Sequence, residues 1–288
     1  AKLESEMIRN GCDVGRVKTI INGDEKIDLE VVVSALAGRY SKKFLVNGVS
    51  RRMVDFAGNV KSVLFGPWDM DLISGSPSGR RRLLDNVLMQ ADHEYRRSLI
   101  SYEKGLTRRN RLLQRIRDEG LSHTQLMFWD SLLIKEGTVL SQKREEFVDF
   151  INQVDKTGEL DLTIEYDKSG ISEERFEKYS SQEVSSGTTL VGPHRDDLIF
   201  RVKDLDLASF GSRGEHRIAV LHLKLAELSF IEYKTKQRPV LLLDDIFSEL
   251  DHKNRDVVMN AVTSTQTIIT TADPHFIVDK EGVQKIEL

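Results

Sequence analysis

The chain has 288 residues, of which 31% are charged and 7% aromatic, with a formal net charge of −4 at pH 7. This length allows about two domains, and the net charge excludes wholesale coating of nucleic acid while leaving room for a local basic patch. The single cysteine, Cys12, excludes an internal disulfide, and neither a signal peptide nor a membrane-spanning stretch is present, so we expect a cytoplasmic protein.

The first part of the chain has the pattern of antiparallel strands. Residues 16–21 and 27–34 flank Asn22-Gly23, and a second turn of the same type, Asn47-Gly48, follows an apolar stretch. Asn-Gly between apolar runs is a strong hairpin signal. Residues 60–65 form one more short apolar run, and we expect residues 1–76 to be mainly antiparallel sheet.

A helical period begins at Ser78, where apolar residues recur at steps of three and four up to Gly120. A second helical run extends from Trp129 to Val154. Two long helices joined at a glycine predict an antiparallel helical arm over residues 77–157. Helices lying flat against the sheet are the alternative that this pattern leaves open.

The first helical run is strongly basic. Between Arg80 and Arg117 it holds eleven basic and four acidic residues, a net charge of +7. Arginines near a helix amino end oppose the helix dipole, which suggests a role other than helix stability. Phosphate is the natural ligand, so we name five candidates for DNA contact: Arg80, Arg81, Arg82, Arg108 and Arg109. For the first three, at residues 80–82, a structural role is the alternative.

Residues 158–288 alternate between strands and helices. Residues 160–166 alternate as a strand, residues 173–179 suggest a short helix, and residues 187–202 suggest two strands about a charged turn at residues 192–197. Ser212-Arg213-Gly214-Glu215 then precedes an amphipathic helix. Such a turn leaves backbone N–H groups free for a phosphate, although the same residues also form an ordinary helix cap.

A fully apolar run, residues 240–243, ends at the acid pair Asp244 and Asp245. A run of this kind fits a central strand of a parallel sheet, with the acids at the carboxyl edge where open α/β folds bind ligands. Ser248 and Asp251 follow directly, and a later strand ends at Thr271. Carboxylates there are costly to desolvate unless a cation occupies the site.

In this order the motifs resemble an ABC-type ATPase head of the SMC kind, and within that class the RecF family. The resemblance covers nearly the whole chain and rests on DLISGSP at residues 71–77, RRRLLD at 80–85, RRNRLL at 108–113, GPHRDD at 192–197 and LLLDDIFSELD at 241–251. It implies an α/β P-loop head of mixed sheets with flanking helices and an inserted antiparallel helical arm. It also implies an ATP-dependent DNA-binding protein of recombinational repair and replication restart, a homodimer around ATP that binds gapped or duplex DNA and a RecR-like recombinase-loading partner.

By resemblance, Asp244 would hold Mg²⁺ through its water shell, and Asp245 would orient the attacking water, with Thr271 near the γ-phosphate. The same comparison places the turn of Ser212, Arg213, Gly214 and Glu215 near ATP bound by the other subunit. Ser248 and Asp251 would lie at the dimer seam. Pro67 and Asp69 would fall in the segment that links nucleotide to arm movement.

The chain departs from the family pattern in two places. Trp68 stands where the family usually has an acid, and no G-x-x-x-x-G-K-[ST] loop occurs in the 288 residues. That loop supplies the backbone cradle and the lysine for the β- and γ-phosphates. Because the chain begins abruptly at Ala1, we expect the loop to lie upstream, and the enzyme to be a DNA-dependent ATPase only at full length.

Two alternatives remain open at this point. One is a non-enzymatic DNA-binding or dimerisation module related to SMC heads, in which the acids and the turn survive as scaffold. The other is a metal-dependent nuclease or Toprim-like phosphotransferase, which would need a third acidic cluster where the neighbouring strand instead ends in Thr270-Thr271.

Overall fold

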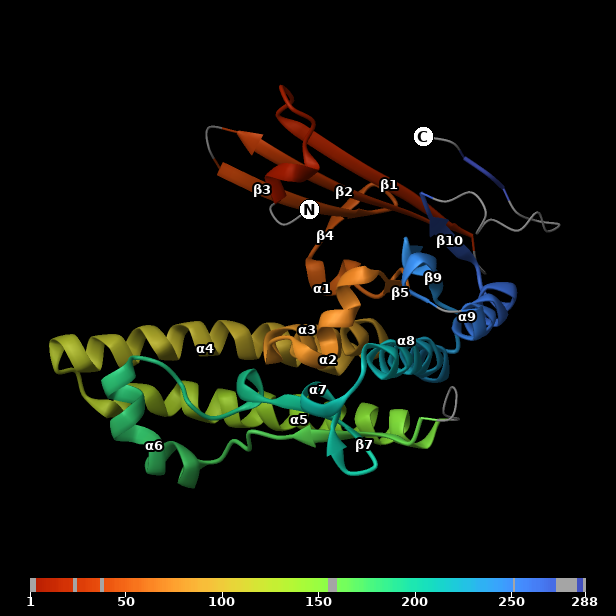
Figure 1. Cartoon of the computed structure of the whole chain (residues 1–288). Helices are drawn as coiled ribbons and strands as arrows, with labels where there is room; N and C mark the ends of the chain where they lie inside the picture. Colours follow the sequence, from red (N-terminus) through yellow and green to blue (C-terminus); the bar gives the residue numbers. More distant parts are fainter. Residues whose placement is uncertain are drawn as a thin grey trace. The chain divides into compact units, whose positions relative to one another are not determined.

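A computed structural model describes residues 4–22, 25–36, 39–154, 160–250, 252–272 and 284–286. The chain divides into two compact units, Ala1–Val60 and Lys61–Leu288 (Figure 1), which are described separately below. The division into residues 1–76, 77–157 and 158–288 remains a prediction. Among the described residues, none of the helices is long and apolar enough to cross a membrane.

The first unit is an antiparallel sheet with the strand order β1-β2-β3-β4. Its strands are β1 (Val14–Asn22), β2 (Lys26–Leu36), β3 (Arg39–Val46) and β4 (Val49–Arg51), preceded by the 3-10 helix η1 (Glu4–Met7) and followed by α1 (Met53–Phe56). Both expected hairpins are present, although Gly23 lies outside the described residues. Asn47 and Gly48 adopt φ angles of 51° and 76°, as the turn required.

The second unit is built on a parallel sheet of order β10-β9-β5. Its strands are β5 (Ser62–Phe65), β9 (Val240–Asp244) and β10 (Thr267–Thr270). The expectation of antiparallel pairing up to residue 76 is therefore wrong for β5, which pairs in parallel with β9 from the far end of the chain. A local apolar pattern cannot reveal so distant a partner.

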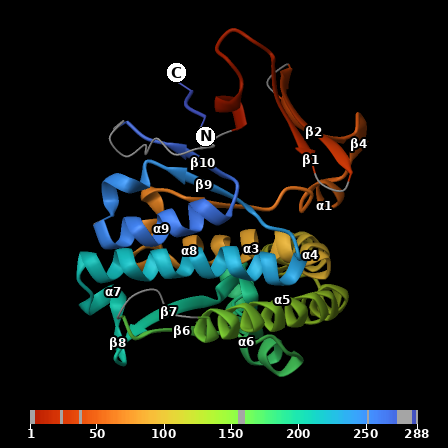
Figure 2. The ribbon, with the colours of Figure 1, turned by 90° about the vertical axis from the view of Figure 1, so that its right-hand side faces the viewer.

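Helices separate this sheet from a second, antiparallel one. The second sheet contains β6 (Leu162–Asp167), β7 (Asp197–Val202) and β8 (Leu205–Asp206). Figure 2 shows α8 (Arg213–Thr235) and α3 (Pro77–Ala91) lying between the two, with α9 (His252–Ser264) beside the parallel sheet. The core includes Leu241 and Leu243 of β9 together with Val220 and Leu223 of α8.

The predicted helical hairpin is confirmed and consists of α4 (His93–Glu119) and α5 (Met127–Gln153), joined through Gly120 and the 3-10 helix η3 (His123–Leu126). The single helix expected from Ser78 to Gly120 is instead two helices, α3 and α4. Asp92 separates them, because its carboxylate accepts a hydrogen bond from the Tyr95 amide and caps α4.

Of the two strands expected within residues 187–202, only β7 is present. Side chains take the backbone hydrogen bonds that a first strand would need. The Thr189 amide donates to the side chain of Asn110 at 2.8 Å, and the Leu190 amide donates to Glu183 at 2.8 Å. Glu183 belongs to α6 (Glu173–Ser186), which packs against α4.

Candidate functional site

The acid pair lies at the carboxyl end of β9, as the sequence predicted. Asp244 is half-buried and accepts a hydrogen bond from the hydroxyl of Thr270, its partner in the parallel pairing of β9 and β10. The Asp245 amide donates to the Thr270 carbonyl at 3.0 Å. The structure therefore fixes one carboxylate against the neighbouring strand and places the other one residue further along the edge.

Asp245 has left-handed backbone geometry, with φ 49° and ψ 29°. A residue with a Cβ atom reaches this conformation at a cost of about 1–2 kcal/mol. It turns the chain from β9 into the 3-10 helix η5 (Ile246–Glu249), and Ile246 and Phe247 bury their side chains at once. The sharp turn leaves the Asp245 side chain half-buried at the strand end instead of in the core.

Thr271 directly follows β10 and is half-buried, so it lies beside the acid pair along the same edge. Ser248 is part of η5, which begins directly after Asp245. The Ser248 side chain and Asp251 lie outside the described residues. Asp244, Asp245 and Thr271 are thus the predicted site residues that the described structure brings together.

The Ser212 turn forms the amino end of α8. The Ser212 hydroxyl accepts from the Glu215 amide at 3.3 Å, and the Glu215 carboxylate accepts from the Ser212 amide and hydroxyl, each at 2.8 Å. These bonds hold the pKa of Glu215 below its ordinary value. Arg213 and Gly214 are exposed, and a Cβ atom on Gly214 would meet nothing closer than the Ser212 hydroxyl at 3.9 Å.

The turn is therefore both a helix cap and an open, exposed surface. The described hydrogen bonds of the Ser212 amide and hydroxyl go to Glu215 and not to Asp244 or Asp245. The turn is thus a capping box whose central residues, Arg213 and Gly214, are exposed.

A buried charge cluster lies next to the carboxyl end of β5. Asp69, in the 3-10 helix η2 (Pro67–Met70), accepts from the Gly66 amide at 2.9 Å and forms an ion pair with Lys224 of α8 at 3.4 Å. Lys224 also pairs with Glu227 at 3.0 Å. Burial raises the pKa of both carboxyls; burial also acts to lower the pKa of Lys224, but the two carboxylates outweigh it and raise that pKa.

Lys224 and Glu227 were not among the residues singled out from the sequence. The sequence did contain a sign of them, because both charged residues lie among apolar residues of α8. Their neighbours Leu223, Ala226 and Leu228 are all buried. Asp69 could not be paired with them without the fold. The cluster ties the helix that follows the Ser212 turn to the segment that follows β5.

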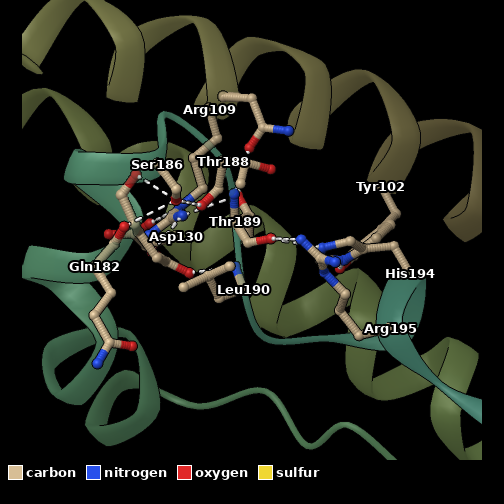
Figure 3. Close-up of polar contacts among 12 residues, drawn as sticks. Tyr102, Arg109, Asp130, Gln182, Ser186, Thr188, Thr189, Leu190, His194 and Arg195 are labelled. Carbon is tan, nitrogen blue, oxygen red and sulfur yellow. Dashed lines mark hydrogen bonds and ion pairs between the residues drawn. The ribbon is translucent and has the colours of Figure 1, made fainter.

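Two of the five arginine candidates are used inside the protein. Arg80 is buried and donates two hydrogen bonds to Asp197, at 2.6 and 2.8 Å. Arg109 is buried and contacts Asp130 at 2.6 Å and Thr189 at 2.9 Å (Figure 3). It also forms an ion pair with Glu183 at 2.7 Å. Because a buried guanidinium must be paired, the structural role is the one that the geometry supports for both.

The other three candidates differ from these. Arg81 is half-buried and donates to the backbone carbonyl of Asp196 at 2.8 Å. Arg82 and Arg108 are exposed. Arg82 and Arg108 therefore remain open to an external ligand.

Residues 192–197 form the centre of an internal polar network. Asp196 is fully buried and accepts from Arg144 at 2.8 Å, from the Ser169 amide at 2.8 Å and from the hydroxyl of Tyr166. Arg144 also contacts Asp85 at 2.8 Å and the Pro193 carbonyl at 2.7 Å. The conspicuous charges of GPHRDD thus join β6, β7, α3 and α5.

His194 is enclosed by this network. Its ring lies 2.8 Å from the hydroxyl of Tyr102 and 3.0 Å from the carbonyl of Thr189 (Figure 3). Burial lowers the pKa of His194 to about 4. The neutral imidazole therefore acts as a structural link between α4 and the loop before β7.

Beside the network is an open groove of ≈ 410 Å³. It is lined by Ser76, Pro77, Ser78, Arg81, Asp167, Arg195 and Asp197. The positive charges of its two arginines are balanced by the negative charges of its two aspartates. In the part of the chain that the structure describes, no group of three or more His, Cys, Asp or Glu side chains could hold a metal ion.

The mixed sheets, the acid pair at a strand end, the capped turn and the inserted helical hairpin define an ABC-ATPase-like head. No protein-family model matches the chain. It is similar to the DNA replication and repair protein RecF of Herpetosiphon aurantiacus, 37% identical over 255 residues, covering 83% of this chain and 66% of that protein. The same protein of Agathobacter rectalis is 34% identical over 298 residues, covering 98% of this chain and 81% of the relative.

A solved structure gives the same result. The recombination mediator protein RecF-ATPrS in the RecFOR pathway superposes with a TM-score of 0.85 and 28% identity, over 94% of this chain and 78% of that one. The predicted fold class is thus confirmed. The chain belongs to the RecF family of DNA replication and repair proteins.

Proposed function

We propose that the full-length gene product is an ATP-dependent DNA-binding protein of recombinational repair, in which the carboxyl edge of β9 forms the metal and water half of an ATP site. The observation that carries the proposal is the Asp244–Asp245 pair, with Asp244 held by the Thr270 hydroxyl. The solved relatives are described as RecF-ATPrS and RecF-ATP.

The carboxylates at this edge are of the kind and number that Mg²⁺ takes from a protein. Mg²⁺ usually takes one or two carboxylates, several waters and substrate phosphates, and it does not need a cage of three protein acids. Asp244 accepts one hydrogen bond from Thr270, and a carboxylate has further lone pairs for water or metal. Bound there, Mg²⁺ would neutralise charge that develops on the phosphate oxygens.

The chemistry of this chain's own residues follows from their positions. Asp245 would accept a hydrogen bond from the attacking water and orient it in line with the γ-phosphate. Thr271, beside it, would hold the same water or a phosphate oxygen. The cradle for the β- and γ-phosphates is not among these 288 residues, which contain no G-x-x-x-x-G-K-[ST], so the ATP part of the proposal concerns a product that carries one.

The proposal extends to the assembly. Ser212, Arg213, Gly214 and Glu215 would face ATP held by a second copy, with Ser248 and Asp251 at the same seam, so that ATP drives a homodimer. Gapped or duplex DNA and a RecR-like partner that helps load recombinase would be the macromolecular ligands, in the cytoplasm. The second candidate is a non-enzymatic DNA-binding or dimerisation module related to SMC heads, in which the acid pair and the Ser212 turn serve only as scaffold.

The substitution Ser212→Asp tests the seam without removing the helix cap, because Asp caps a helix as well as Ser. Asp cannot donate to Glu215 as the Ser212 hydroxyl does, so we expect the free energy of unfolding to fall by about 0.5–1 kcal/mol. The added negative charge would repel the γ-phosphate, so sedimentation velocity should show that ATP no longer drives the full-length protein from monomer to dimer.

A matched control exists on α6, where the Ser172 hydroxyl accepts from the Arg175 amide at the same 3.3 Å distance. The substitution Ser172→Asp adds the same charge to another helix cap and should leave ATP-driven dimerisation intact. If Ser212→Asp dimerises with ATP as well as wild type does, the Ser212 turn is not at the seam.

A further inference from the structure

One face of α4 carries a continuous line of exposed basic side chains. They follow one another at steps of seven, four, three and four residues: Arg97, Lys104, Arg108, Arg111 and Arg115. At 3.6 residues per turn these steps keep all of them within one narrow strip of the helix surface. At 1.5 Å per residue the strip is roughly 27 Å long. We call it the α4 basic stripe.

The opposite face of α4 is fully occupied. Tyr95, Tyr102, Arg109 and Leu113 are buried there, where α4 packs against α5 and α6. Arg109 is therefore buried and paired with Asp130, whereas its neighbour Arg108 is exposed. The helix separates its basic residues into an internal, paired set and an external set.

The external set is almost unpaired within the part of the chain that the structure describes. Arg115 pairs with Glu119 at 2.9 Å, at the end of the stripe. No described hydrogen bond or ion pair involves Arg97, Lys104, Arg108 or Arg111. Like charges three and four residues apart repel one another on a helix, so the stripe opposes helix stability unless an anionic ligand covers it.

The composition of the stripe selects the kind of ligand. Among the described residues, the exposed large hydrophobic side chains include none from α4. A protein interface normally has an apolar or aromatic centre, whereas the phosphate backbone of a nucleic acid is met by cations with little apolar contact. Guanidinium groups also match phosphate oxygens in pairs and are weakly hydrated.

We propose that the α4 basic stripe binds the phosphodiester backbone of duplex DNA along the length of α4. The inference deepens the proposed function, on which it rests, by naming the contact surface. At 3.4 Å per base pair the stripe matches about eight base pairs. Contact through phosphates alone makes this binding independent of base sequence.

The test is the salt dependence of DNA binding by the full-length protein carrying Lys104→Gln, Arg108→Gln and Arg111→Gln. Fluorescence anisotropy with a labelled 20-base-pair duplex, from 50 to 200 mM KCl, gives the slope of log K against log salt. The slope is negative, and each lost phosphate contact reduces its magnitude by about 0.9. The magnitude for the triple variant should therefore be smaller than that for wild type by roughly 2.7. Glutamine is a good helix former, so we expect circular dichroism and urea unfolding to match wild type.

A control triple variant removes the same charge from exposed lysines outside the stripe: Lys135→Gln, Lys178→Gln and Lys236→Gln. The proposal is supported if the magnitude of the slope decreases in the stripe variant and stays within about 0.5 of wild type in the control variant. Equal falls in both variants, or no fall in the stripe variant, overturn it while leaving DNA binding intact. If wild type binds no duplex at 50 mM KCl, the DNA part of the proposed function fails and the stripe inference fails with it.

Discussion

The buried arginines of this protein act as connectors between elements. Arg144 is 2% exposed and contacts Asp85, Asp196, Tyr95 and the Pro193 carbonyl, so that one side chain joins α3, α4, α5 and the segment before β7. Burial raises the pKa of Asp196, and the hydrogen bonds from Tyr166 and Arg144 oppose that rise. The helical hairpin is therefore joined to its neighbours through the buried ion pair of Arg144 and Asp196.

His194 gives this region a defined pH dependence. Its pKa falls from 6.5 to about 4, first because the ring is buried and also because Arg195, Arg81 and Arg109 are near, against the Thr189 carbonyl, which raises it. Between these pH values the unfolded chain binds a proton that the folded protein does not. This residue therefore removes up to ~3 kcal/mol of stability as the pH falls through that window.

NMR titration of the His194 ring should thus give a pKa near 4, and urea unfolding of His194→Gln should depend less on pH between 6.5 and 4 than wild type does. The variant His123→Gln, at an exposed position on η3, is measured in parallel as a control for the histidine-to-glutamine change itself. A His194 titration midpoint near 6.5 would show that the ring is not enclosed as described.

At the scale of elements, the Asp69–Lys224–Glu227 cluster fixes α8 to the segment after β5. Lys224→Met leaves two buried carboxylates without a cation, which should destabilise the protein by about 3–5 kcal/mol at pH 7. The pKa values of both carboxyls then stand above those in the unfolded chain, so the penalty should shrink as the pH is lowered toward 5. Urea unfolding at the two pH values measures this difference.

Lys234, on the same helix, pairs with Glu146 nearer the surface. The substitution Lys234→Met should cost about 1 kcal/mol or less at either pH. A Lys224→Met variant as stable as Lys234→Met would mean that the buried cluster is not held as the structure places it.

Element boundaries show what the sequence can and cannot predict. The helical hairpin was predictable, since a period of three and four persists along α4 and α5. The break at Asp92 was not, because Leu88, Ala91 and Tyr95 keep that spacing across it. The prediction of a strand at residues 187–192 was wrong, because side chains of two helices accept the backbone N–H groups of this segment. Asn110 of α4 accepts from Thr189, and Glu183 of α6 accepts from Leu190.

The candidate site was predictable to a similar degree. The acid pair was recognisable because an apolar strand ends there, and Thr271 because a second strand ends beside it. Arg108 and Arg109, by contrast, have the same local pattern in sequence, and only the fold shows that one is exposed and the other buried. The ion pair of Lys224 and Asp69 could not be predicted from the sequence, because only the packing of α8 on β5 brings the two residues together.

For the whole molecule, the central claim is that the carboxyl edge of β9 positions a metal and a water for ATP hydrolysis. The relevant variant is Asp245→Asn in the full-length gene product, which removes the carboxylate proposed to orient the water and leaves Asp244 with its Thr270 contact. The 288-residue chain is the control, and without a phosphate loop it should show no ATP affinity in calorimetry.

The most direct measurement is single-turnover ATP hydrolysis by this variant at saturating ATP, with ATP affinity measured in parallel. We predict an ATP affinity within about threefold of wild type and a hydrolysis rate lower by about 10²-fold or more. A variant that binds and hydrolyses ATP at the wild-type rate would contradict the assignment of Asp245.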